Sequence, residues 1–199
     1  INEIPEPVDY GIVLVPAKNA PETMRECAEK GVRFAQFLAS GFSEHSKEGR
    51  RLEEEIVKIA KGKTRIIGPN CMGIYCPGSG LTFRPDFETE EGSAAFISQS
   101  GGFAIGFTLW AQSLGVRFSK VISYGNACDL NECDFIEYLG RDKKTKIIAA
   151  YIESIKDERR FLNVCGEVAK KKSLIIWKAG ATKEGALAAK YHTGYETSA

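Results

Sequence analysis

Residues 94–102 read Ala-Ala-Phe-Ile-Ser-Gln-Ser-Gly-Gly, an apolar run that ends in a turn rich in serine and glycine. The run Ala94–Ile97 has the length and composition of a buried strand. The segment Gly101–Leu114 that follows carries apolar residues at helical spacing. A strand that passes through a glycine turn into a helix is the repeating unit of α/β folds, so this stretch predicts that class.

The same alternation of short apolar runs and amphipathic segments continues on both sides of this unit. It predicts a parallel sheet covered by helices on both faces, with functional groups where the strands end in loops. The predicted strands cover residues 10–15, 34–38, 65–67, 120–123, 147–152 and 174–177, and the predicted helices cover residues 21–30, 46–61, 133–140 and 159–171.

The stretch from Cys76 to Gly92 interrupts the alternation. It contains prolines, glycines and the acidic run Glu88–Glu91. Such a composition is typical of a linker between domains. We therefore expect two domains, one over residues 1–88 and the other over residues 92–199.

The composition is that of an ordinary soluble globular protein, with 43% hydrophobic and 27% charged residues among 199. The net charge of +1 gives no reason to expect nucleic acid, which generally requires a concentrated basic face. No apolar run approaches the roughly 20 residues that span a bilayer. The opening residues 1–7 lack the basic and apolar segments of a signal peptide. We expect a cytoplasmic protein that binds neither nucleic acid nor membrane.

The six cysteines are spread along the chain, and none forms a Cys-x-x-Cys pair. This pattern disfavours zinc and thioredoxin-like sites, so we expect no bound metal. Free and mostly buried thiols fit a reducing cytosol better than a disulfide framework. The six are Cys27, Cys71, Cys76, Cys128, Cys133 and Cys165.

The turn at the end of strand 94–97 is a candidate phosphate-binding site. Gly101 and Gly102 let the backbone approach an anion, and the first N–H groups of the helix point outward. Ser98 and Ser100 add hydroxyl donors, and the helix dipole favours negative charge at this end. The same residues also fit an ordinary serine N-cap beside a loose turn, so both interpretations stay open.

Two better-known motifs do not match this turn. It is not a Walker loop, because no Gly-Lys-Ser/Thr follows it. It is not a nucleophile elbow, because Gln99 is flanked by serines rather than glycines. A serine hydrolase with Ser100 as nucleophile remains an alternative, although no esterase pattern accompanies it.

The chain has only two histidines, His45 and His192. His45 lies in a polar turn before a predicted helix and is expected to be a solvated capping residue. His192 follows a predicted strand, a glycine turn and a segment of small residues. A lone histidine is more often structural than catalytic, so His192 needs a partner before chemistry is assigned to it.

Glu153 is the candidate partner, because it directly follows the predicted strand 147–152 and should lie at the carboxyl edge of the sheet. A carboxylate bonded to one imidazole nitrogen leaves the other nitrogen nucleophilic. The serine- and glycine-rich turn could then hold a phosphoryl group carried by His192. A surface glutamate is the plainer alternative.

Five short motifs together carry a specific resemblance. They are Gly68-Pro-Asn-Cys-Met-Gly73, Ile97-Ser-Gln-Ser-Gly-Gly102, Tyr124-Gly-Asn126, Tyr151-Ile-Glu153 and His192-Thr-Gly194. In this order and spacing they resemble ADP-forming acyl-CoA (acetyl-CoA) synthetases and, more distantly, the α subunit of succinyl-CoA synthetase. The likeness covers essentially the whole chain, and the combination is more specific than any one motif.

The resemblance implies a partial Rossmann-like CoA-binding domain followed by a flavodoxin-like parallel-sheet domain that carries a phosphohistidine. It places Val15, Pro16 and Ala17 beside the CoA nucleotide, and Asn70 and Cys71 near the thioester. Cys71 is not expected to carry the acyl group, since a small buried residue fits that position equally well. The family's CoA domain begins with further strands and a glycine-rich turn, so we expect this sequence to be a piece of a longer chain.

The family cleaves an acyl-CoA with phosphate, giving an acyl phosphate and CoA, and then moves the phosphoryl group through a histidine to ADP or GDP. The resemblance implies CoA and phosphate as ligands, with magnesium and ADP or ATP held by an ATP-grasp (β-type) domain or subunit in an oligomer. The implied catalytic residues are His192 and Glu153, and the implied phosphate-binding residues are Ser98, Ser100, Gly101 and Gly102.

Three other functions stay open. The module could regulate a fused acetyltransferase, or it could be a silent CoA-binding scaffold. A flavin-binding module shares the flavodoxin-like expectation, but the hydroxyl-rich phosphate loop that it needs is missing, and fold alone does not decide function. The presence of both His192 and Glu153 argues against a silent scaffold.

Overall fold

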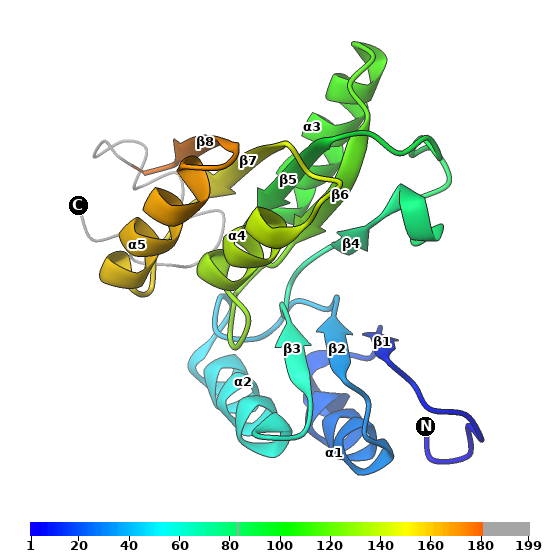
Figure 1. Cartoon of the computed structure of the whole chain (residues 1–199). Coiled ribbons are helices and arrows are strands. Elements are labelled where there is room, and N and C mark those ends of the chain that lie inside the picture. Colours follow the sequence, from blue (N-terminus) through cyan, green and yellow to red (C-terminus); the bar gives the residue numbers. More distant parts are fainter. Residues whose placement is uncertain (83, 181–199) are drawn as a thin grey trace. The chain divides into compact units, whose positions relative to one another are not determined.

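The structure is a computed structural model that describes residues 1–82 and 84–180 (Figure 1). Strands and helices alternate through this part of the chain, which confirms the predicted α/β class. The chain divides into two compact units. Among the described residues, the first contains Ile1–Gly73 and Tyr124–Leu130, and the second contains Ile74–Ser123 and residues 131–180.

The first unit is built on a parallel sheet of three strands in the order β1-β2-β3. The two helices bury apolar stripes that include Met24 and Ile56, which have no exposed surface. His45 is exposed, as expected, but it does not cap α2. The cap is the neighbouring Ser46, whose short hydroxyl accepts a backbone N–H (3.0 Å). The elements are β1 (Tyr10–Val13), α1 (Ala20–Lys30), β2 (Phe34–Phe37), α2 (Lys47–Ala60) and β3 (Arg65–Ile67).

The segment Tyr124–Leu130 belongs to the first unit although it is distant in sequence. Asp129 forms a two-pronged ion pair with Arg65, with Oδ1 and Oδ2 each 2.9 Å from a guanidinium nitrogen, and it accepts the N–H of Ile66 (2.8 Å). The N–H of Leu130 donates to the carbonyl of Ile66 (3.2 Å). The segment therefore runs along the outer side of β3 and covers the edge of the sheet.

Gly125 is the position where this segment tolerates no side chain. Its φ is +53°, and a Cβ there would lie 2.1 Å from the carbonyl oxygen of Pro69 and 2.3 Å from that of Asn70. We expect Gly125→Ala to lower the free energy of unfolding by about 3 kcal/mol, since left-handed strain adds to the displacement of two carbonyls. The measurement is urea denaturation followed by circular dichroism.

Gly62 provides the matched control within the same unit. Its φ is also positive, at +75°, but an added Cβ would meet nothing within 4 Å. Gly62→Ala should therefore cost only the left-handed strain, about 1 kcal/mol. Equal losses for the two variants would show that the Pro69 and Asn70 carbonyls move freely, contrary to the steric argument.

The second unit contains a five-stranded sheet in the order β4-β6-β5-β7-β8. The pairs β5–β6, β5–β7 and β7–β8 are parallel, and their helices cover both faces, with α4 and α5 on one face and α3 on the other (Figure 1). The elements are β4 (Gly73–Tyr75), β5 (Ala94–Ser98), α3 (Gly101–Ser113), β6 (Phe118–Ser123), α4 (Glu132–Arg141), β7 (Ile147–Ile152), α5 (Glu158–Ala169) and β8 (Ser173–Lys178).

Aromatic side chains form much of the packing in this second unit. The ring of Phe96 on β5 lies 4.4 Å from that of Phe107 on α3, measured between ring centres. Phe87 is buried and its ring lies 4.8 Å from that of Tyr75 on β4. Part of the stretch read as a linker, residues 76–92, therefore packs into the core of the second unit.

Several strand bounds differ from the prediction by one or two residues, and one strand was not predicted. The strand expected over residues 10–15 ends at Val13, and Leu14 is exposed just before Pro16. β4 was not predicted, because three residues that directly follow a turn are too few to show a strand pattern. Between residues 1 and 180, leaving out 83, no helix is both long and apolar enough to cross a membrane.

Candidate functional site

The carboxyl ends of β5, β7 and β8 bring the candidate catalytic groups of the second unit to one edge. In the parallel register, Ser98 pairs with Tyr151 and Ile152 pairs with Lys178. Adjacent parallel strands end side by side, so the turn after β5 and the residues after β7 are neighbours. The structure thus brings Ser98–Gly102 and Glu153 together, as the sequence predicted.

The turn after β5 is arranged as an anion-binding helix start. Ser100 is the N-cap of α3, and its Oγ accepts the N–H of Phe103 (3.2 Å). Within the described residues, the N–H groups of Gly101 and Gly102 donate to no acceptor, and a Cβ on Gly102 would meet nothing within 4 Å. These N–H groups are therefore free of partners among the described residues, and a phosphate could accept from both.

The two serines of this turn have different roles in the structure. The hydroxyl of Ser98 is fully buried and donates to the carbonyl of Ser100 (2.7 Å), so its proton is used inside the turn. The Oγ of Ser100 acts as acceptor in the cap, which leaves its own proton available to a ligand. Both the cap and the anion-binding interpretation fit this geometry, and Ser98 shapes the turn rather than facing a ligand.

Glu153 is 1% exposed, and it follows β7 at the same edge as the turn. Burial raises the pKa of Tyr151, and the nearby charge of Glu153 together with a hydrogen bond to its carboxylate adds to the rise. The carboxylate therefore lies beside the Tyr151 side chain inside the unit. Because Glu153 is buried, the surface-glutamate alternative is excluded.

Two residues at this edge were not identified from the sequence. Gln99 is 3% exposed and its side chain joins the turn to the backbone of Glu153 and Ser154. Lys178 ends β8 and donates to the carbonyl of Glu153 (2.9 Å). A long polar side chain at the end of a strand is the only sequence signal for either role.

The predicted CoA-binding residues lie in the first unit, after the ends of β1 and β3. Val15 and Ala17 are half-buried against the core, and Pro16 is exposed between them. Asn70 has a left-handed backbone (φ +56°), and its amide donates to Oδ1 of Asn126 (3.4 Å). These residues thus lie at the carboxyl edge of a parallel sheet, the edge that binds ligands in such folds.

Asn126, from the motif Tyr124-Gly-Asn126, is held by acidic side chains of the first unit. Its Nδ2 donates to Oε2 of Glu44 (2.6 Å) and to Oε2 of Glu53 (2.8 Å). Ser43 donates its hydroxyl to Glu53 as well (2.7 Å). The amide therefore donates hydrogen bonds to two close carboxylates and ties the motif to the loop before α2 and to α2 itself.

Cys71 is buried, with Sγ 3.6 Å from the carbonyl of Phe37 and 3.7 Å from that of Ile67. Burial raises the pKa of this thiol to about 12, although a backbone hydrogen bond from Gly73 acts in the opposite direction. A thiol with this pKa carries almost no thiolate at neutral pH, so it is not a nucleophile. The geometry agrees with the expectation that Cys71 carries no acyl group.

We expect Cys71 to resist alkylation by iodoacetamide at pH 8 in the folded chain. Its rate should be at least about 10²-fold below that in urea, where the thiol pKa returns to about 8.5. Peptide mass spectrometry measures the rate, with the less buried Cys76 as the internal control. Alkylation of Cys71 as fast as Cys76 in the folded chain would contradict the assignment.

His192 lies outside the described residues, so its place relative to Glu153 remains a prediction. Among residues 1–82 and 84–180, no three His, Cys, Asp or Glu side chains are grouped so that they could hold a metal ion.

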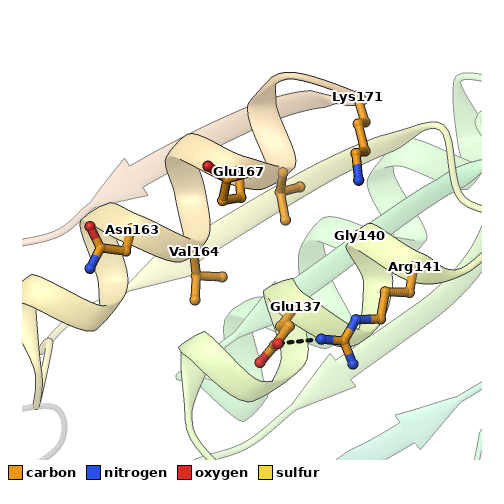
Figure 2. A pocket seen from close by; sticks show the side chains of 8 residues that line it. Glu137, Gly140, Arg141, Asn163, Val164, Glu167 and Lys171 are labelled. Atoms are coloured by element: carbon orange, nitrogen blue, oxygen red, sulfur yellow. Dashed lines mark hydrogen bonds and ion pairs between the residues drawn. The ribbon is translucent and has the colours of Figure 1, made fainter.

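A groove of about 330 Å³ lies between α4 and α5 of the second unit (Figure 2). The ion pair between Arg141 and Glu137 (2.5 Å) lies on the α4 side, and Val168 packs close to Gly140 where the helices approach. The groove is lined by the last turn of α4, which ends at Arg141, and the chain then leads to the start of β7 at Ile147. The groove therefore lies toward the edge of the sheet where the strands begin. The groove is separate from the candidate site. Its lining is Glu137, Gly140, Arg141, Asn163, Val164, Glu167, Val168 and Lys171.

Two family models match the chain. Residues 91–199 match the succinyl-CoA ligase like flavodoxin domain, and residues 1–77 match a CoA binding domain. This order confirms the predicted CoA-binding domain followed by a flavodoxin-like domain.

Several relatives of known name are ADP-forming acetate–CoA ligases. The ADP-forming acetate–CoA ligase II subunit alpha of Pyrococcus furiosus is 45% identical over 195 residues, which cover 98% of this chain and 43% of that protein. The ADP-forming acetate–CoA ligase I of Archaeoglobus fulgidus is 41% identical over 196 residues, which cover 96% of this chain and 28% of that protein. The chain thus spans less than half the length of the relatives that it matches.

A solved structure agrees with these relatives. The dinucleotide forming acetyl-coenzyme A synthetase 1 of Candidatus Korarchaeum cryptofilum, in complex with phosphate and ADP, matches with a TM-score of 0.93 at 33% identity. The match covers 100% of this chain and 43% of that one. The fold therefore agrees with that enzyme over the full length of the present sequence.

Proposed function

This chain belongs to the succinyl-CoA ligase-like family of ADP-forming acyl-CoA synthetases, and we propose that it is the CoA-binding and phosphohistidine part of such an enzyme. Residues 1–88 would contribute to the CoA site, and residues 92–199 would carry the phosphoryl group on His192. The observation that carries the proposal is the helix start at Gly101 and Gly102, next to the buried Glu153. The N–H groups of these two glycines donate to no acceptor among the described residues.

The proposed reaction begins with an acyl-CoA. An oxygen of phosphate attacks the thioester carbonyl, the carbon–sulfur bond breaks, and CoA leaves as the thiol while an acyl phosphate forms. An imidazole nitrogen of His192 then attacks the phosphorus, and the carboxylic acid leaves. ADP finally takes the phosphoryl group from His192, which gives ATP and restores the free imidazole.

Several described residues have a defined role in these reaction steps. Glu153 accepts a hydrogen bond from one imidazole nitrogen and thereby keeps the other nitrogen nucleophilic. The N–H groups of Gly101 and Gly102, with the hydroxyl of Ser100, donate to the oxygens of the bound phosphoryl group. The dipole of α3 favours its negative charge without a further cation.

An ATP-grasp domain or β-type subunit is the proposed partner, because the chain spans less than half of its relatives. That partner would hold ADP or ATP together with magnesium, which neutralises charge on the transferring phosphoryl group. We expect no complete reaction from this chain alone. The names of the relatives make acetate the first acyl group to test, and they do not favour a regulatory module.

The test is phosphoryl transfer in both directions. The chain is incubated with an ATP-grasp partner, magnesium and ATP labelled on the γ-phosphate. We expect an acid-labile and base-stable label on the chain, as a phosphohistidine gives, and its return to ATP when ADP is added. Acetate and CoA together should also discharge the label. No label, or an acid-stable label, would refute the proposed function.

A further inference from the structure

The side chain of Gln99 reaches from the turn across to the residues after β7. Its Oε1 accepts the N–H of Glu153 (2.9 Å) and the N–H of Ser154 (2.9 Å). Its Nε2 donates to Oγ of Ser154 (2.8 Å), and its own backbone N–H donates to the carbonyl of Tyr151 (3.0 Å). Four hydrogen bonds from one buried residue therefore connect the two halves of the candidate site.

The peptide on the other side of Glu153 is held from β8. The ammonium of Lys178 donates to the carbonyl of Glu153 (2.9 Å) and to the carbonyl of Ala179 (2.6 Å). The N–H of Ala179 donates to the carbonyl of Ile152 (2.8 Å). Both the N–H and the carbonyl of Glu153 are thus bonded, so its backbone has little freedom to shift.

We propose that Gln99 is a positioning residue that fixes Glu153 relative to the phosphate-binding turn. An amide suits this role because one end of the side chain offers an acceptor for two N–H groups and a donor for a hydroxyl. The amide is also neutral, so it adds no charge beside an incoming phosphate. The inference rests on the proposed function, since it takes Glu153 and the turn as parts of one phosphoryl-transfer site.

The first arm of the test is the rate of labelling by ATP. Gln99→Met keeps the length and volume of the side chain and removes its hydrogen bonds. We expect the maximal labelling rate to fall about 30-fold, with little change in the ATP concentration for half-maximal rate, because a shifted carboxylate impairs the chemistry rather than nucleotide binding. Gln112→Met is the matched control, since Gln112 is also buried and its side chain donates to Tyr75 (3.1 Å), away from Glu153. It should label within about 2-fold of wild type.

A double-mutant cycle separates positioning from a general loss of structure. If Gln99 acts through Glu153, adding Gln99→Met to Glu153→Gln should slow labelling by no more than about 2-fold further. Multiplication of the two single effects would overturn the proposal, as would wild-type labelling by Gln99→Met. Should Gln99→Met fail to fold, Gln99→Asn takes its place, because its shorter amide cannot reach Glu153.

The second arm needs no catalysis and therefore stands if the proposed function fails. Amide hydrogen exchange of Glu153 and Ser154 should speed up about 10-fold in Gln99→Met. Gln99→Glu retains an acceptor for both N–H groups and should keep their protection within about 2-fold of wild type. Unchanged exchange in Gln99→Met, or equal loss in both variants, would overturn the proposal.

Discussion

Replacing His192 with asparagine is expected to lower labelling of the chain by ATP at least about 10³-fold, because asparagine has no nucleophilic nitrogen. The two side chains are similar in polarity, so the fold should be retained. The measurement is the initial rate of acid-labile label formation with the ATP-grasp partner present. Circular dichroism of the variant shows whether the folded chain was tested.

His45 makes the matched control, since it is the only other histidine in the sequence. It is exposed in the turn before α2, and Ser46 rather than His45 caps that helix. His45→Asn should label at the wild-type rate. If His45→Asn lost the label and His192→Asn kept it, His45 would be the phosphoryl carrier and the proposal would be wrong.

The α/β fold could be predicted because its elements are local patterns. A buried strand such as Ile147–Ile152 and an amphipathic helix such as Lys47–Ala60 are each visible within one window of sequence. The position of Glu153 followed from the same local pattern, since it directly follows a strand whose carboxyl end forms the site edge. The structure then added its burial, which the sequence could not give.

Contacts between distant residues could not be predicted in this way. Asn126 and Glu53 are 73 positions apart, and the pair Arg65–Asp129 spans 64. A single sequence does not show which distant segments pack together. The place of the segment Tyr124–Leu130 in the first unit therefore came only from the structure. The contact between Gln99 and Glu153, which are 54 positions apart, also came only from the structure. From the sequence alone, Gln99 had no role in the turn.

Replacing Glu153 with glutamine is expected to slow phosphoryl transfer to His192 about 10³-fold, or about 4 kcal/mol in the activation free energy. Glutamine has the same shape, but it cannot provide the negative charge that stabilises the imidazolium form and fixes the tautomer. Because the neutral amide is easier to bury than a carboxylate, the variant should fold. The rate of label formation measures the loss, and a rate within about 3-fold of wild type would remove the orienting role.

Two further measurements connect this loss to the site itself. The charge of Glu153 adds to the raised pKa of Tyr151, so that pKa should fall in Glu153→Gln while burial still keeps it above the ordinary value. An ultraviolet titration of the tyrosines detects the change. The matched control is Glu158→Gln, because Glu158 is an exposed carboxylate in the first turn of α5 and should label like wild type. If Glu158→Gln were as slow as Glu153→Gln, the loss would follow from the overall charge at this edge and not from a carboxylate that orients His192.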